Sequence, residues 1–174
     1  RRRARRLPAV TSAYYLVDTV PDGPAASLTG PEGRHAADVA RVRIGETLLI
    51  GDGLGSVADC EVTAVSRGAV TARIVARRYV PAPAHTVVAV QALAKGDRGT
   101  LAVETMTELG VDVIVPWAAS RSIAQWREER ADKSLARWRA TAREAAKQSR
   151  RAWHPVVQPL HATAQVADLI AAAD

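Results

Sequence analysis

The feature that most constrains this chain is a change in residue pattern at Pro81-Ala82-Pro83-Ala84. Before it, short apolar runs are separated by turn residues, and after it, longer apolar runs alternate with stretches of helix-forming residues. Proline fixes its own backbone dihedral and lacks an N–H donor, so this segment supports no regular secondary structure. We therefore expect a linker at 81–85 between two domains of different fold class.

The first part, 14–80, has the pattern of a small β domain. Strands are predicted where β-favouring residues cluster between turns that contain glycine or proline. The strands fall at 14–17, 47–50, 56–65 and 69–75, the turns at 21–24, 30–33, 51–55 and 66–68, and one short helix at 36–41. Together these elements predict a small, mostly antiparallel barrel or sandwich.

The second part, 86–174, alternates strands with helices. Continuous apolar runs predict buried strands, at 86–93, 111–117 and 156–157. Helices are predicted from an Asp97 N-cap to Leu109 with Gly110 as its stop, from an Asp132 cap to about Arg151, and over 163–173. This order predicts a parallel α/β domain. About three strands are few for an open parallel sheet, and the next is expected at Asp174, so we expect an incomplete domain.

Positive charge is concentrated in two segments. The formal net charge is +6 and the pI is about 10.2. Residues 1–13 contribute +5 and residues 121–151 contribute +6, so the rest of the chain carries −5. This distribution favours a polyanion-binding surface that includes 121–151. The arginine-rich residues 1–13 are expected to form a flexible, solvated tail.

The remaining composition excludes several classes of protein. A hydrophobic content of 48% is enough for a buried core, but three Tyr, four Trp and no Phe leave few rings for stacking on bases. Cys60 is the only cysteine, so no internal disulfide forms, and no Cys and His spacing matches a metal site. Neither a signal peptide nor a membrane-spanning run is present, so we expect a cytoplasmic protein without a metal.

The long helix at 132–151 carries two stripes. At 100° per residue, one stripe is apolar and is formed by Leu135, Trp138, Ala142, Ala145, Ala146 and Ser149. The other is basic and is formed by Arg139, Arg143, Lys147 and Arg150. The basic stripe predicts contacts with phosphates, and a solvated face partly paired with nearby acids is the alternative.

Three further groups of residues were considered for chemistry. Glu104 and Glu108 share one helix face, which makes them candidates for acid and base, with solvated surface as the alternative. Lys95 and Arg98 follow a buried strand and precede a helix, where α/β proteins place ligand contacts. The four histidines form no catalytic or metal-binding pattern.

In their order along the chain, several motifs resemble one family, the 16S rRNA uridine N3-methyltransferases called RsmE. The motifs are His35–Glu46, Asp52–Gly55, Gln91–Arg98, Thr107–Val111, Arg121-Ser122, Arg137-Trp138, and Glu144–Arg151 with Pro155. Each is modest by itself, and the ordered set covers nearly the whole chain after residue 14.

The resemblance implies a fold and an activity. It implies an RNA-binding PUA-like β-barrel at 14–80 and the first part of a SPOUT-type α/β methyltransferase domain at 86–174. It also implies S-adenosylmethionine as the methyl donor, 16S rRNA of the 30S subunit as the substrate, and a homodimer. Family members continue into a Gly-Pro-Glu-Gly-Gly loop that forms much of the donor pocket. We therefore expect the donor site to lie beyond Asp174, and the chain by itself not to bind the donor.

The resemblance also implies roles for residues. His35, Arg41 and Arg43 become RNA contacts on the barrel side. The substrate side of the active site is expected to include Lys95, Arg98, Glu108, Arg121, Gln148, Ser149 and Arg150. With Arg151 and the basic stripe added, these residues make up the expected RNA-binding and catalytic set.

The implied reaction places demands on that set. The N3 atom of uridine lies on its Watson–Crick edge, so the target must be unpaired or flipped out. N3 must also lose its proton, and we hypothesise that Arg121 or Arg150 stabilises the uracil anion. The rival hypothesis is a non-catalytic module that binds rRNA and transfers nothing. A small-molecule α/β enzyme is disfavoured because no phosphate loop, triad or metal set is visible.

Overall fold

The computed structural model describes residues 12–126 and 129–173, so the predicted tail at 1–11 lies outside the described residues. The chain divides into two compact units, residues 1–80 and residues 81–174. We call them unit 1 and unit 2. As expected, an antiparallel sheet is followed by a parallel one.

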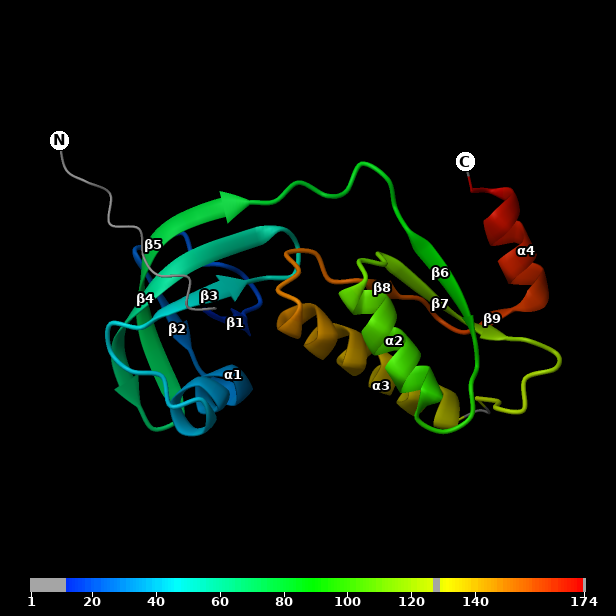
Figure 1. The fold of residues 1–174 in the computed structure, drawn as a ribbon, viewed down its shortest axis with the longest axis horizontal. Coiled ribbons are helices and arrows are strands. Elements are labelled where there is room, and N and C mark those ends of the chain that lie inside the picture. The colour runs from blue at the N-terminus through cyan, green and yellow to red at the C-terminus, as the bar shows by residue number, and fades with distance from the viewer. Residues whose placement is uncertain (1–11, 127–128, 174) are drawn as a thin grey trace. The chain divides into compact units, whose positions relative to one another are not determined.

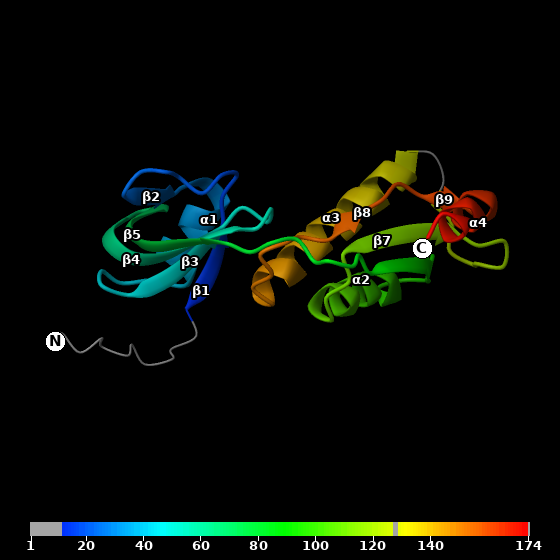
Figure 2. The ribbon, with the colours of Figure 1, turned by 90° about the horizontal axis from the view of Figure 1, so that it is seen from above.

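Unit 1 is built on a five-stranded sheet with the order β1-β3-β4-β5-β2. The strands are β1 (Ala13–Leu16), β2 (Ala25–Leu28), β3 (Thr47–Gly51), β4 (Ser56–Ser66) and β5 (Ala69–Tyr79). β1 pairs with β3 in parallel, and the other neighbours are antiparallel. β4 and β5 form a long, curved ribbon (Figures 1 and 2). The inward positions of this sheet, such as Ile50, Val62 and Val70, form the core of unit 1.

Two short helices follow β2, where the sequence predicted a turn and then one helix. The predicted turn at 30–33 is the start of α1 (Gly30–Arg34), because Pro31 occupies the first turn, where its missing N–H is not needed. The predicted helix at 36–41 is a π-helix, η1 (His35–Val39). α1 packs closely on unit 1: a Cβ at Gly33 would collide with the carbonyl oxygens of Leu28, in β2, and of Gly68, in the turn between β4 and β5.

Unit 2 has a parallel sheet with helices packed on it. In the described residues its strands are β6 (Val88–Ala92), β7 (Val113–Ala118), β8 (Val156–Val157) and β9 (His161–Ala162). The helices are α2 (Arg98–Glu108), α3 (Glu129–Gln148) and α4 (Thr163–Ala171). α2 and α3 run side by side along the sheet, and α4 lies beside β9 (Figure 1). Leu93, Val103, Ile114, Trp138, Ala142 and Val157 form the shared core.

The boundaries of α3 differ from the prediction at both ends. The helix begins at Glu129, so Asp132 lies within it and is not its N-cap. It ends at Gln148 and not near Arg151, because the backbone at Arg150 turns into the left-handed region with a φ of 54°. Asp97 does occupy the N-cap position of α2, but its carboxylate pairs with Arg137 and makes no capping bond.

The guanidinium of Arg151 joins several segments of unit 2. Its Nη1 donates hydrogen bonds to the carbonyl oxygens of Thr107 and Val111, at the end of α2 and just before β7. Its Nη2 lies 2.8 Å from Oδ1 of Asp112, and Oδ2 of Asp112 accepts a bond from the N–H of Val87. The two side chains are 14% and 16% exposed. Arg151 therefore has a structural role, and the expected RNA contact there stays a prediction.

We predict that Arg151→Ala destabilises unit 2 by about 3 kcal/mol, because it leaves a largely buried carboxylate and two carbonyls without their partner. Arg137→Ala is the matched control, since its pair with Asp97 is 62% and 90% exposed. The control should cost less than about 0.5 kcal/mol. Urea unfolding followed by helical circular dichroism, which mainly reports α2, α3 and α4, measures both. Equal losses would contradict the prediction.

Candidate functional site

The structure brings one group of predicted cations to the carboxyl edge of the unit 2 sheet. Because its strands are parallel, their carboxyl ends meet at one edge, where α/β proteins bind ligands. Lys95 and Arg98 follow β6, and Arg121 follows β7. All three side chains are exposed. Lys95, Arg98 and Arg121 therefore form a candidate RNA-facing group.

A second group lies at the opposite edge. Gln148 is the last residue of α3, and Ser149 and Arg150 follow it before β8. All three are next to the Arg151 contacts at the amino ends of β6 and β7. α3 has 20 residues and is therefore about 30 Å long. Arg121 and Arg150, the two candidates for stabilising the uracil anion, consequently lie at opposite edges of one unit. They cannot contact the same uracil within that unit.

Arg150 occupies a backbone position that normally favours glycine. Its N–H donates to the carbonyl of Lys147 at 3.1 Å, and the N–H of Arg151 donates to the carbonyl of Ala146 at 2.8 Å. This pair of bonds is the Schellman motif, whose left-handed residue is usually glycine. Arg150 has a φ of 54° and an exposed side chain. Local strain of this kind is typical of functional positions, which supports a role for the Arg150 guanidinium.

Arg41 has the same backbone geometry in unit 1. It follows η1, has a φ of 54°, and is exposed together with Arg43. The helix ends through bonds from the N–H of Ala40 to the carbonyl of His35 and from the N–H of Val42 to the carbonyl of Ala36. In the described residues, Arg41 and Arg150 are the two residues other than glycine with a positive φ. Both were candidates for RNA contacts.

His35 has a packing role as well. Its ring lies edge-on to the ring of Tyr15, with centroids 6.0 Å apart and an interplanar angle of 68°. Since Tyr15 belongs to the core of unit 1, this contact holds His35 against the sheet. The imidazole is still on the exposed side of unit 1, so an RNA contact stays a prediction.

The predicted basic stripe on α3 is interrupted. Lys147 is only 6% exposed, with its Nζ 3.9 Å from a carboxylate oxygen of Glu144. Nε of Arg139 donates to the carbonyl of Val157 at 3.2 Å. The stripe is therefore partly paired within unit 2, as the alternative to phosphate binding expects: Lys147 is buried, whereas Arg139 stays exposed despite its bond to a carbonyl. Arg143 and Arg150 are exposed.

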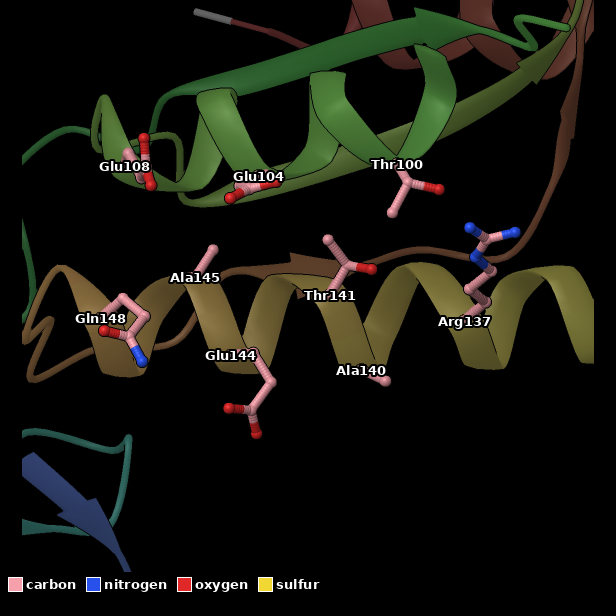
Figure 3. Close-up of a pocket in the computed structure, with 9 residues that line it drawn as sticks. All are labelled: Thr100, Glu104, Glu108, Arg137, Ala140, Thr141, Glu144, Ala145 and Gln148. Atoms are coloured by element: carbon pink, nitrogen blue, oxygen red, sulfur yellow. The ribbon is translucent and has the colours of Figure 1, made fainter. Parts of the chain in front are cut away.

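A hollow of about 410 Å³ lies between α2 and α3 (Figure 3). Glu104 and Thr100 extend from α2 toward α3, and Thr141 and Ala145 extend from α3 toward α2. The lining residues are Thr100, Glu104, Glu108, Arg137, Ala140, Thr141, Glu144, Ala145 and Gln148. Three carboxylates against one guanidinium disfavour phosphate binding, so the neighbouring Glu104 and Glu108 are not part of a phosphate site.

Several kinds of chemistry find no support among the described residues. No cluster of His, Cys, Asp and Glu there could hold a metal ion. Burial raises the pKa of the Cys60 thiol to about 11, so at neutral pH it is protonated and a poor nucleophile. None of the helices in the described ranges is both long and apolar enough to cross a membrane.

Asp112 was missed by the sequence analysis. Its carboxylate holds Arg151 and so supports the turn that presents Arg150. A lone aspartate between a helix stop and a strand gives no signal of this role, because its partner lies 39 residues away in the sequence.

Two family models match the chain. The model of an RNA methyltransferase domain matches residues 81–174, and the model of an RNA methyltransferase PUA domain matches residues 28–75. The chain is 46% identical over 155 residues to the ribosomal RNA small subunit methyltransferase E of Mycobacterium tuberculosis, which covers 88% of this chain and 59% of that protein. It is 30% identical over 151 residues to the Bacillus subtilis protein of the same name, which covers 84% and 58%.

Solved structures show the same likeness. The ribosomal RNA small subunit methyltransferase E of Neisseria gonorrhoeae, bound to S-adenosyl methionine, has a TM-score of 0.78 and 27% identity, covering 90% of this chain and 65% of that one. A putative methyltransferase from Legionella pneumophila in complex with the same cofactor has a TM-score of 0.78 and 22% identity, covering 91% and 66%. The second likeness shows the fold alone. The chain spans about 59% of the length of its mycobacterial relative.

We predict that Arg150→Gly stabilises unit 2 by about 1 kcal/mol, because glycine adopts the left-handed conformation without strain. Such a gain raises the Tm of a domain of this size by about 4–8 °C. Arg150→Ala is the control: it removes the same guanidinium but keeps a Cβ, so it should leave the Tm nearly unchanged. Differential scanning calorimetry compares the two variants. A lower Tm for the glycine variant would show that the Arg150 side chain itself stabilises the fold.

Proposed function

The chain belongs to the ribosomal RNA small subunit methyltransferase E family, and on this premise we propose that the protein carrying it methylates N3 of a uridine in 16S rRNA. S-adenosylmethionine is the proposed methyl donor. The observation that carries the proposal is the 46% identity to a curated member over a stretch that includes both units. The exposed cations in both units supply the chemistry that RNA phosphates require.

The carboxyl edge of the unit 2 sheet is the proposed substrate side. Lys95 and Arg98 bind phosphates next to the target nucleotide, and Arg121 faces its uracil. Loss of the N3 proton leaves a negative charge on the uracil ring and its oxygens, and a nearby guanidinium stabilises that charge. At the other edge, Arg143 and Arg150 bind a more distant part of the RNA through its phosphates.

In unit 1, His35, Arg41 and Arg43 are proposed as contacts that position the rRNA. Contacts of this kind add affinity and orientation without reading the sequence. Gln148 and Ser149 have a smaller part in this proposal, because the Ser149 hydroxyl already donates to the carbonyl of Ala145 at 2.7 Å. Lys147, Arg139 and Arg151 support the packing of unit 2.

The methyl donor supplies an electrophilic carbon. Among the described residues, the hollow between α2 and α3 does not fit its adenosyl group: the lining residues include no aromatic ring for the adenine and no glycine-rich loop. We assign no donor-binding residue in the described chain, and the residues named above bind and orient RNA.

The proposed working form is a homodimer acting on the 30S subunit in the cytoplasm. The second candidate is a module that binds rRNA without transferring a methyl group, favoured by the exposed cations of both units. The two differ in one assay. Transfer of labelled methyl groups to 30S subunits supports the enzyme, and salt-dependent RNA binding without transfer supports the module.

We predict different effects for Arg121→Ala and Arg150→Ala in the full-length protein. Arg121→Ala should lower the single-turnover methylation rate by about 10²- to 10³-fold, because it removes a group that stabilises charge in the transition state. Arg150→Ala should weaken RNA binding and lower the salt dependence by about one phosphate contact, with the rate at saturating RNA unchanged. Single-turnover assays across RNA concentrations separate the two. An unchanged single-turnover rate in Arg121→Ala would remove Arg121 from the chemistry.

A further inference from the structure

A second hollow, of about 250 Å³, lies in unit 1 and belongs to none of the groups above. Its lining residues are Val20, Asp22, Ser56, Val57, Arg77, Arg78 and Tyr79. Ser56 pairs with Tyr79 at one end of the β4–β5 ribbon, and Ser66 pairs with Ala69 at the other. The helices before Arg41 contact the latter end, where Asp38 accepts a bond from Gly68. The hollow is thus roughly 30 Å along the ribbon from the Arg41 surface.

Tyr79 gives the hollow an accessible aromatic ring. It is the last residue of β5 and is 64% exposed, whereas Tyr14 and Tyr15 are 5% and 1% exposed. Large exposed rings are uncommon in this chain, and an exposed tyrosine beside a cation is the combination that proteins use to stack on unpaired bases. Val20 is buried and provides an apolar part of the lining.

Arg77 gives the hollow a fixed positive charge. It lies two residues before Tyr79 and therefore on the same face of β5. Its Nε and Nη2 donate to the carbonyl oxygen of Pro21 at 3.0 and 2.8 Å, and Nη2 also donates to the carbonyl of Gly23. These carbonyls hold the guanidinium in place, and since they carry no net charge they leave its positive charge available to an anion.

The other charged residues of the hollow have different roles. Arg78 points to the opposite face, where it pairs with Asp59 at 2.7 Å. Its charge is therefore compensated within unit 1. Asp22 carries the one carboxylate among the residues that line the hollow. A carboxylate next to a stacked base accepts hydrogen bonds from the imide or amino N–H groups on the base edge.

We infer that this hollow binds a single unpaired nucleotide, with its base stacked on Tyr79 and its phosphate against Arg77. Asp22 accepts a hydrogen bond from the base edge, and Ser56 also lines the hollow. The identity of the ligand as a nucleotide within rRNA rests on the proposed function. The position at the far end of the ribbon makes it a second RNA contact of unit 1, apart from Arg41 and Arg43.

The inference is tested with fluorescence anisotropy of a labelled single-stranded 12-nucleotide RNA and the full-length protein. Tyr79→Ala should weaken binding by roughly 5- to 100-fold, as expected for one stacked base. Tyr79→Phe keeps the ring and should bind within about twofold of the unchanged protein. Val75→Ala is the matched control, since Val75 is an exposed β5 residue, 56% exposed, that does not line the hollow.

Salt dependence separates stacking from charge. Tyr79→Ala should keep the slope of log affinity against log salt, because a stacked base releases no counterions. Arg77→Gln should lower that slope by about 0.7, and Arg77→Lys should largely retain it. Wild-type affinity in Tyr79→Ala, with folding intact by urea unfolding, would overturn the inference.

Two further measurements identify the ligand and test the inference separately from the proposed function. Uridine monophosphate at millimolar concentration should displace the RNA only weakly if the hollow takes a nucleotide within a strand; tight binding of the mononucleotide would overturn that identity. Methyl transfer to 30S subunits is measured alongside. If Tyr79→Ala loses RNA affinity, the inference is supported even when no methyl group is transferred. If Tyr79→Ala transfers methyl groups normally and keeps its RNA affinity, the inference is contradicted and the proposed function is not.

Discussion

The packing of several segments of unit 2 depends on the largely buried guanidinium of Arg151. Its bonds to the carbonyls of Thr107 and Val111 and to the carboxylate of Asp112 connect the segment after α3 to the end of α2 and the start of β7. Asp112 in turn holds the N–H of Val87, just before β6. Since Arg151 directly follows Arg150, the same contacts fix the left-handed turn. The largely buried guanidinium of Arg151 thereby fixes the backbone that carries the exposed side chain of Arg150.

The exposed cations are placed by the topology of the sheet. Parallel strands bring Lys95 and Arg121 to one edge, although 26 positions separate them in the sequence, and they leave Arg150 at the other. The proposed RNA contacts at the two edges are therefore separated by about the length of α3, roughly 30 Å. The hollow between α2 and α3 is lined by three carboxylates and one guanidinium, a charge balance that repels phosphates.

Much of the fold followed from the sequence, and the side-chain environments did not. Apolar runs and turn residues predicted the long strands and α2, because periodicity reports local structure directly. The sequences of β2 (Ala-Ala-Ser-Leu) and β9 (His-Ala) contain none of the β-branched and aromatic residues Val, Ile, Thr, Tyr, Phe and Trp that mark strands, so both were missed. The prediction that Lys147 belongs to an exposed basic stripe on α3 was wrong. The burial of Lys147 depends on packing against other segments, and the periodicity of one helix carries no information about that packing. Similarly, no local signal marks the left-handed turn at Arg150.

The proposed activity, methylation of N3 of a uridine in 16S rRNA by the protein carrying this chain, leaves a chemical mark that can be measured in cells. The most direct measurement compares nucleosides from digested 16S rRNA of a strain that lacks the gene, the parent strain, and the deletion strain complemented with the full-length gene. Mass spectrometry quantifies 3-methyluridine in each. If the protein makes 3-methyluridine in 16S rRNA, this nucleoside is lost on deletion and restored by complementation. An unchanged level of 3-methyluridine in the deletion strain would contradict it.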